Sequence, residues 1–304
     1  MSDGALIIDK PPGLTSHDVV AAARRILRER RIGHAGTLDP LATGVLVLLC
    51  GKATRLARFA SASDKTYDAT VLFGLTTETY DVSGTVTSRS TETVTADAVI
   101  TAAAALTGTY LQEPPAYSAK QVGGQRAYEL ARRNQPVELR AVPVTVSALT
   151  VTSVADQRAV ITLTCSAGFY VRSFAHTLGQ RVGPGACLES LRRTRSGAFG
   201  LDEAIGLEAL QAADRPESAL LPVTRVVAWM PERMVTAEGR ERVAHGRELR
   251  EGHLVPSGPA AGASPPSAGP SPDDWVRISD DSGALIAVAT AGRDGALHPS
   301  VVLI

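Results

Sequence analysis

Two strand-like runs close together in the chain constrain its fold more than any other feature. Residues 142–154 and 158–165 are rich in β-branched side chains that alternate with polar ones, and a short polar turn separates the runs. This pattern is typical of a β-hairpin, whose strands are antiparallel. Because hairpin-like spacing dominates over strand–helix–strand alternation elsewhere, the sequence predicts an α+β protein with a mostly antiparallel mixed sheet flanked by helices.

Local patterns predict the remaining elements. The apolar run at residues 45–50 is typical of a buried strand, and residues 65–73 alternate polar and apolar side chains as a half-buried strand does. Ser16 is the expected N-cap of the first helix, because its hydroxyl follows a turn with two prolines and a glycine. Helices are expected at residues 17–29, 52–60, 96–106 and 126–133, and over a segment that ends at residue 182.

The 304 residues are enough for one large core and a second, smaller domain. We expect a catalytic domain over residues 1–222 and a small β-rich domain over residues 223–304. Within the second domain, residues 256–272 contain six prolines with Gly, Ser and Ala and no charged side chain. Such a composition buries too little apolar surface to offset the entropy of ordering, so a disordered insertion is expected at about residues 255–273.

Charge and cysteine usage exclude several classes of protein. Lys plus Arg and Asp plus Glu both number 31, so net charge gives no indication of a polyanionic partner. Arginines do cluster in the first helix and just after it, and they include Arg24, Arg25, Arg28 and Arg31. Such a cluster can bind a polyanion, and the alternative interpretation is a helix face that is simply solvated. The three cysteines are far apart and form no CxxC pair, which argues against a disulfide framework and a thiolate metal site. With no apolar signal segment or membrane span, the sequence predicts a cytoplasmic protein.

Residues 33–44 form the most informative stretch for function. Three glycines, two threonines and a proline in this stretch rule out a regular helix. Asp39 precedes Pro40, whose ring disfavours the helical conformation for the residue before it, so the Asp39 carboxylate is expected to project from a shaped loop. No phosphate-binding GxxxxGK[ST] pattern, clustered histidine ligands or GxSxG nucleophile accompanies it. A catalytic carboxylate and a turn-stabilising aspartate both remain open at this point.

Five motifs in order then identify a resemblance. The stretch GHAGTLDPLATGVL at residues 33–46 resembles the catalytic motif of TruB-type tRNA pseudouridine-55 synthases. The other stretches similar to this family are DKPPGLTS at 9–16, KTY at 65–67, PPAYSAK at 114–120 and GFYVR at 168–172. The resemblance covers roughly residues 4–225 and implies the pseudouridine synthase fold, with a weaker likeness of the C-terminal domain to small PUA-like RNA-binding modules.

The resemblance implies that a uridine in the T-loop of tRNA is isomerised to pseudouridine without a metal or cofactor. Asp39 would stabilise or attack the sugar at C1′ when the base leaves, and Arg172 would pair with Asp39. Tyr67 would stack on the flipped uracil and help remove the C5 proton. Tyr170 and Leu191 would pack around the base, although core packing explains them almost as well.

Further residues are implied in supporting roles. Lys10 would support the pocket, and His34 would occupy the space that the flipped base vacates. The arginines of the first helix and the segment after it would contact phosphates. The T-arm stem-loop of tRNA is the expected partner, and a monomer without an obligate protein partner is expected. One departure is Thr177, which stands where the family commonly has an Asp before Leu-Gly.

Two other functions remain open from the sequence. A non-catalytic RNA-binding or tRNA-folding protein could retain the same scaffold, but it would not need Asp39, Tyr67 and Arg172 together. Archaeal and eukaryotic relatives of the family act in guide-RNA complexes, whereas a compact chain without charged tails fits a stand-alone enzyme of the bacterial type better.

Overall fold

The computed structural model describes residues 3–118, 120–122, 125–126, 130, 133, 139–256, 275–292 and 294–304. The chain divides into two compact units. Unit 1 comprises Met1–Asp39, Val45–Ser63 and Ser196–Ile304, and unit 2 comprises Pro40–Gly44 and Asp64–Arg195. The helix predicted at 126–133 and the insertion predicted at 255–273 lie almost wholly outside the described residues.

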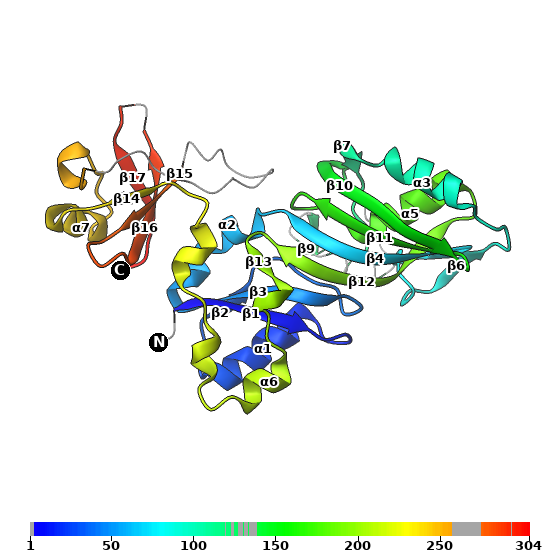
Figure 1. Cartoon of the computed structure of the whole chain (residues 1–304), viewed down its shortest axis with the longest axis horizontal. Helices are drawn as coiled ribbons and strands as arrows, with labels where there is room; N and C mark the ends of the chain where they lie inside the picture. Colours follow the sequence, from blue (N-terminus) through cyan, green and yellow to red (C-terminus); the bar gives the residue numbers. More distant parts are fainter. Residues whose placement is uncertain are drawn as a thin grey trace. The chain divides into compact units, whose positions relative to one another are not determined.

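Unit 2 is built on a sheet whose strands are mostly antiparallel (Figure 1). Its strand order is β12 (Ala186–Ser196), β4 (Lys65–Phe73), β11 (Arg158–Cys165), β10 (Val142–Ala155) and β7 (Gly108–Gln112). Strands β10 and β11 form the predicted hairpin, in which Leu149 pairs with Leu163. Helices α3 (Ala96–Ala104) and α5 (Val171–Val182) pack against each other, and they contact β10 and β4, respectively. Two short hairpins complete the described part of unit 2: β5 (Leu75–Thr77) with β6 (Val86–Arg89), and β8 (Gln121–Val122) with β9 (Gln125–Arg126).

Strand β4 shows why the sequence pattern predicts this sheet. Every second side chain from Lys65 to Phe73 is buried, whereas the intervening ones are half-buried or exposed. A strand points successive side chains to opposite faces, so the alternation selects one buried face. Tyr67 lies on that buried face, opposite Leu163 of β11.

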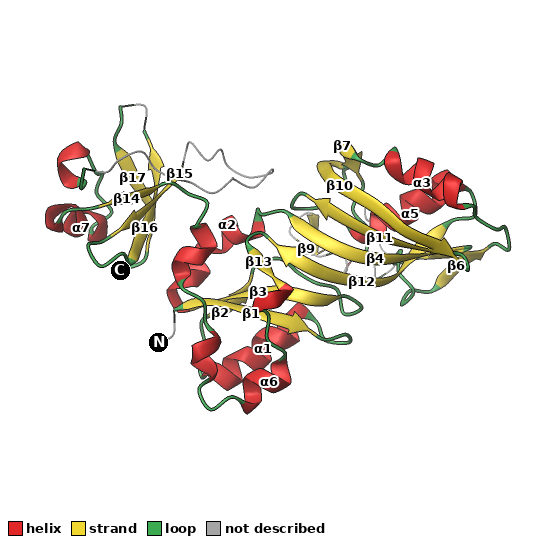
Figure 2. Cartoon of the chain, in the orientation of Figure 1, coloured by secondary structure: helices red, strands yellow, loops and turns green. Residues whose placement is uncertain are grey.

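The N-terminal part of unit 1 contains β1 (Gly4–Lys10), β2 (Ile32–His34) and most of β3 (Thr43–Cys50) (Figure 2). Strand β3 pairs with β1 and, antiparallel, with β2. Its first two residues belong to unit 2, where Thr43 and Gly44 pair parallel with Arg192 and Arg193 of β12. Strand β3 is buried from Gly44 to Cys50, as its apolar run predicts.

Short helices connect the strands of unit 1. Outside the C-terminal part of unit 1, the α-helices are α1 (Ser16–Leu27), α2 (Ala57–Ser61) and α6 (Leu207–Ala212). Tighter 3₁₀ turns are η1 (Gly51–Leu56), η2 (Leu201–Glu203), η3 (Pro216–Ala219) and η4 (Val223–Val227), and β13 (Phe199–Gly200) pairs with β12.

The C-terminal part of unit 1 is a four-stranded sheet. Its order is β14 (Glu232–Met234), β15 (Trp275–Ser279), β16 (Leu285–Ala291) and β17 (Leu297–Val302), with helix α7 (Ala237–Ala244) and the turn η5 (Glu251–His253) beside it. An apolar cluster that includes Val243 and Ile278 fills this sheet's own core. Val288 and Leu303 belong instead to the larger cluster around Ile7 and Phe59. The α+β fold class with a β-rich C-terminal part is confirmed, and the domain boundary at residue 222 stays a prediction.

Four details of the predicted helices are wrong, each by a few residues or in helix type. Helix α1 has Thr15, not Ser16, as its N-cap, because the Thr15 hydroxyl accepts a hydrogen bond from the Asp18 amide at 3.1 Å and the Asp18 carboxylate accepts one from the Thr15 amide at 2.9 Å. This reciprocal pair is a capping box. The helix ends at Leu27, and Arg28 follows it in the left-handed region at φ 51°. Helix α3 ends at Ala104 rather than at residue 106, and the helix predicted at 52–60 begins as a 3₁₀ turn.

None of the helices in the described ranges is long and apolar enough to cross a membrane.

Candidate active site

The loop that carries Asp39 runs between β2 and β3 and contains no helix. Asp39 is half-buried, whereas Leu38 before it is 3% exposed. The hydroxyl of Ser16 accepts a hydrogen bond from the Leu38 amide at 2.8 Å and donates one to the Leu38 carbonyl at 3.0 Å. Both main-chain groups of the residue before Asp39 are therefore held by one buried side chain.

Lys10 holds the turn that precedes this hydroxyl. Its side chain is fully buried, and its ammonium group donates hydrogen bonds to the carbonyls of Pro11 at 2.9 Å and Leu14 at 2.7 Å. A buried ammonium needs such acceptors, because a charge without them is costly away from water. Lys10 thus shapes the turn that leads into Thr15 and Ser16.

His34 ends strand β2, is half-buried and pairs with Leu48 of β3. Of the arginines on and after α1, Arg24 donates from its guanidinium to the Ile32 carbonyl at 2.7 Å, which ties the helix to the start of β2. Arg25, Arg28 and Arg31 are exposed. Arg24 therefore has a structural contact of its own, although it is exposed like the other three.

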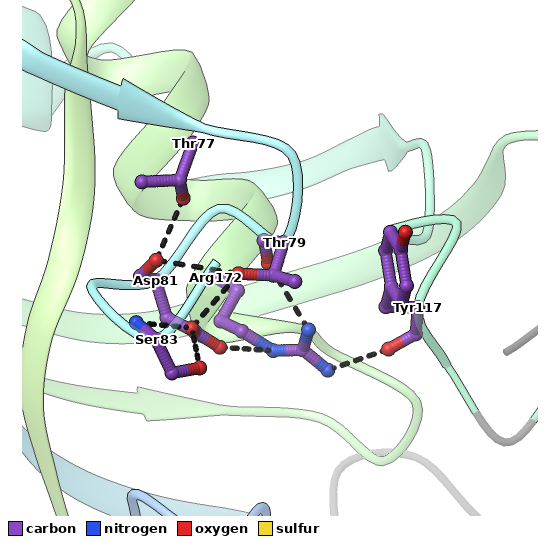
Figure 3. Close-up of polar contacts among 6 residues, drawn as sticks. All are labelled: Thr77, Thr79, Asp81, Ser83, Tyr117 and Arg172. Carbon is purple, nitrogen blue, oxygen red and sulfur yellow. Dashed lines mark hydrogen bonds and ion pairs between the residues drawn. The ribbon is translucent and has the colours of Figure 1, made fainter. Parts of the chain in front are cut away.

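Arg172 lies in the first turn of α5 in unit 2 and is 5% exposed (Figure 3). Its guanidinium donates hydrogen bonds to the carbonyls of Thr79 at 3.1 Å and Tyr117 at 3.0 Å. Its Nε lies 3.7 Å from Oδ2 of Asp81, which is also buried. The guanidinium of a buried arginine so surrounded has a fixed direction.

Hydrogen bonds also fix the carboxylate of Asp81, which faces Arg172. Its Oδ1 accepts hydrogen bonds from the Thr79 hydroxyl at 2.9 Å, the Ser83 amide at 3.0 Å and the Ser83 hydroxyl. The neighbouring Tyr80 has φ 63°, and its ring stacks on His176 with centroids 4.0 Å apart. Burial lowers the pKa of His176, which favours the neutral ring in this stack.

Tyr67, Tyr170 and Leu191 also belong to unit 2. Tyr67 and Leu191 are each 8% exposed, and the Leu191 carbonyl accepts a hydrogen bond from the Thr43 hydroxyl at 3.4 Å. Tyr170 is the N-cap residue of α5. The side chain of Gln112 accepts from the Tyr170 amide at 2.8 Å and donates to the Tyr170 carbonyl at 3.0 Å. Gln112 thus fixes the main chain where α5 begins.

Two further buried cations lie in unit 2. Lys65 is 6% exposed and Arg193 is 1% exposed. Burial, together with the charge of Arg193, lowers the pKa of Lys65 to about 8.

The main chain of Arg193 also explains why a glycine stands at residue 44 of the loop motif. Gly44 has φ +95°, and a Cβ there would lie 2.2 Å from the Arg193 carbonyl oxygen. Only glycine fits this close parallel pairing.

Neither a metal-binding cluster nor a reactive cysteine is found in the described part of the chain. Within it, no group of three or more His, Cys, Asp or Glu side chains is arranged to hold a metal ion. The three cysteines are buried and free. Burial raises the pKa of Cys50 and Cys165 to about 12 and that of Cys187 to about 11, so these thiols are not activated as nucleophiles.

The predicted site residues thus fall into two groups. Unit 1 holds Lys10, His34, Asp39 and the α1 arginines, whereas unit 2 holds Tyr67, Tyr170, Arg172 and Leu191. The pairing of Asp39 with Arg172 stays a prediction. Three contacts that hold members of these groups in place are not indicated by the sequence: those of Asp81, of Gln112 and of the Ser16 hydroxyl with Leu38.

Comparison with known proteins defines the class. The model of the TruB family pseudouridylate synthase N-terminal domain matches residues 24–171. The chain is 41% identical over 305 residues to "tRNA pseudouridine synthase B" of Solibacter usitatus (strain Ellin6076), an alignment that covers 99% of this chain and 100% of that protein. It is 44% identical over 273 residues to the protein of the same name from Thermobifida fusca (strain YX), covering 85% of this chain and 90% of that one.

A solved structure also has a fold similar to that of this chain. A chain in the crystal structure of a Cbf5-Nop10-Gar1 complex superimposes with a TM-score of 0.75 at 25% identity, which covers 100% of this chain and 85% of that one. The fold and the matched family model together define a pseudouridylate synthase, an enzyme of the isomerase class. The chain belongs to the TruB family of these enzymes.

Proposed function

We propose that this enzyme isomerises uridine 55 in the T-loop of tRNA to pseudouridine. The observation that carries the proposal is the Asp39 loop, in which a half-buried carboxylate follows a residue clamped at both main-chain groups. Relatives that cover almost all of the chain carry the name "tRNA pseudouridine synthase B", which supports tRNA as the substrate. A carboxylate fixed in direction is what a reaction at a sugar carbon requires.

The reaction exchanges one bond of the sugar for another. The C1′–N1 bond breaks, the uracil rotates, and a C1′–C5 bond forms; the C5 proton is then lost and N1 gains a proton, so no oxidant is needed. The sugar acquires positive character at C1′ as the base leaves, and the Asp39 carboxylate stabilises this charge or attacks it.

Residues of unit 2 would receive the base and support the carboxylate. Tyr67 stacks on the flipped uracil and assists removal of the C5 proton, and Arg172 pairs with Asp39 and orients the carboxylate. Tyr170 and Leu191 pack around the base. The contacts of the buried Arg172 guanidinium support its role because they fix its direction, and the hydrogen bond to Gln112 fixes the main chain of Tyr170.

The RNA must be opened before this reaction, since a base in a folded loop is reached only by flipping it out of the stack. We propose that His34 fills the vacated space and that Lys10 supports the loop through the turn it holds. Exposed Arg25, Arg28 and Arg31 contact phosphates. Residues 223–304 form a small RNA-binding domain, and the enzyme acts as a cytoplasmic monomer without a cofactor or an obligate protein partner.

The test uses a tRNA transcript with tritium at C5 of uridine, incubated with the purified protein alone. The wild type is expected to release one tritium per tRNA, and Asp39→Asn to release none while it still binds the transcript. Asp97→Asn, which removes an exposed carboxylate in α3, is the matched control and should react at the wild-type rate.

Two results would contradict the proposal. Release that persists in Asp39→Asn would remove Asp39 from the reaction. A folded wild type that binds tRNA but releases no tritium would favour a non-catalytic RNA-binding or tRNA-folding protein on the same scaffold.

A further inference from the structure

We propose that Ser16 is a positioning residue for Asp39, an inference that rests on the proposed function. Ser16 is 2% exposed, and its hydroxyl makes two hydrogen bonds to the same residue of the Asp39 loop, one from the Leu38 amide and one to the Leu38 carbonyl. The two residues are 22 positions apart in the sequence, so the clamp joins the start of α1 to the loop.

The clamp acts on Asp39 through the peptide plane. The Leu38 carbonyl and the Asp39 amide nitrogen belong to one planar unit, so fixing the oxygen also fixes the direction in which the chain enters Asp39. Pro40 then restricts Asp39 to extended conformations. With the chain fixed before it and restricted after it, the main chain at Asp39 has few conformations left, and this sets the direction of the Cα–Cβ bond that carries the carboxylate.

The hydroxyl of Ser16 is not needed to start the helix. Thr15 and Asp18 already form the capping box of α1, with both main-chain amides engaged. The turn before them is held by the ammonium group of Lys10. Because these residues account for the local structure, the two bonds to Leu38 are the specific contribution of Ser16.

A purely structural role for Ser16 predicts a different pattern of effects from a positioning role. If the hydroxyl only satisfied buried main-chain groups, its removal would lower stability and leave the rate constant of the bound substrate unchanged. If it positions Asp39, its removal lowers that rate constant while tRNA binding persists, because small displacements of a reacting group cost up to about 100-fold in rate.

The experiment compares Ser16→Ala, Ser16→Thr and Thr95→Ala under single-turnover conditions with enzyme in excess over tritiated tRNA. Ser16→Ala should lower the rate constant by about 10- to 100-fold, with a Kd for tRNA within about twofold of wild type. Ser16→Thr keeps the hydroxyl and should retain most of the rate. Thr95→Ala removes the N-cap hydroxyl of α3, so it lowers stability away from the loop and should leave the rate unchanged.

Amide hydrogen exchange of residues 33–42 gives a readout that does not depend on turnover. Ser16→Ala should exchange faster there, and Thr95→Ala should match wild type. If Ser16→Ala fails to fold, Ser16→Cys takes its place, since the thiol has a similar shape but forms only weak hydrogen bonds; its rate should lie well below wild type.

The positioning role is refuted if Ser16→Ala reacts at the wild-type rate or if its only defect is in Kd. It is also refuted if Thr95→Ala loses as much rate as Ser16→Ala. A wild type that releases no tritium refutes the proposed function instead, a result that is separate from the comparison among variants.

Discussion

The main chain that leads to Asp39 in unit 1 and the start of α5 in unit 2 are held by different physical means. In unit 1 a neutral hydroxyl, that of Ser16, binds the main chain next to Asp39. In unit 2 the side chain of Arg172 is itself bound, by two carbonyls and by the buried carboxylate of Asp81. The first arrangement fixes a backbone, and the second fixes a charge.

This difference decides what each region tolerates. Loss of a neutral hydrogen bond costs little beyond the unsatisfied groups it leaves behind. Loss of one member of a buried ion pair leaves an uncompensated charge in a medium that solvates it poorly. Substitutions in unit 2 are therefore expected to affect stability first, whereas Ser16 is expected to affect catalysis first.

The largest effect on stability should come from Arg172→Leu, which leaves Asp81 buried without its cation. We expect the free energy of unfolding, measured by urea denaturation, to fall by about 3–5 kcal/mol. Arg158→Leu is the matched control, because its ion pair with Glu189 is solvent-exposed, and it should leave the urea midpoint nearly unchanged.

A double variant sharpens the same comparison. Adding Asp81→Leu to Arg172→Leu removes both charges and should recover part of the lost stability, since the remaining groups are neutral. If Arg172→Leu unfolds at the wild-type urea concentration, the ion pair contributes nothing and the contrast between the two regions fails.

An intermediate effect on the free energy of unfolding is expected from Lys65→Met, which removes another buried cation of unit 2. The pKa of Lys65 is lowered from 10.5 to about 8, so between these pH values the unfolded chain holds a proton that the folded chain has lost. The free energy of unfolding therefore rises with pH in this window relative to Lys65→Met, by at most about 3 kcal/mol.

Below pH 8 both states carry the Lys65 charge, and Lys65→Met should be the more stable protein there. Urea denaturation of both proteins at several pH values between 7 and 10.5 measures the difference. Lys52→Met, which changes an exposed lysine, should give a difference that does not vary with pH. A flat difference for Lys65→Met as well would show that burial does not shift this group.

The smallest effect should come from Thr15→Ala in unit 1. This change removes the capping box of α1 but leaves the Ser16 hydroxyl in place, and the loss of such a cap costs about 1 kcal/mol. Thermal unfolding should show a modest fall in Tm, while the single-turnover rate constant stays close to wild type. A rate as low as that of Ser16→Ala would mean that the helix end, and not the clamp, sets the position of Asp39.

Periodic patterns predicted the elements better than the contacts between them. The alternation in β4 and in the β10–β11 hairpin follows directly from one buried face, so their bounds were predicted almost to the residue. The N-cap of α1 was misplaced by one residue because Thr15 and Ser16 are adjacent and both are good caps. Local propensity cannot choose between two such neighbours.

The contacts of Asp81 and Gln112 had no local signal. Asp81 lies in a polar turn that any Asp–Val–Ser–Gly sequence would favour, and its partner Arg172 comes much later in the chain. Gln112 sits at the end of an ordinary strand, and only the fold brings its amide to Tyr170. The site loop itself was predicted because its glycines disfavour a regular helix and its proline restricts the residue before it, wherever the loop lies in the fold.

The division of the chain also sets an order for its biosynthesis. All of unit 2 has been translated once residue 195 is made, whereas unit 1 still lacks its third stretch, Ser196–Ile304. The core of unit 1 includes Leu303 beside Ile7 and Phe59, so strands β1 and β3 wait for the last residues before their core closes. On the ribosome, unit 2 is thus the part that can fold first, and the core of unit 1 closes only after nearly the whole chain has emerged.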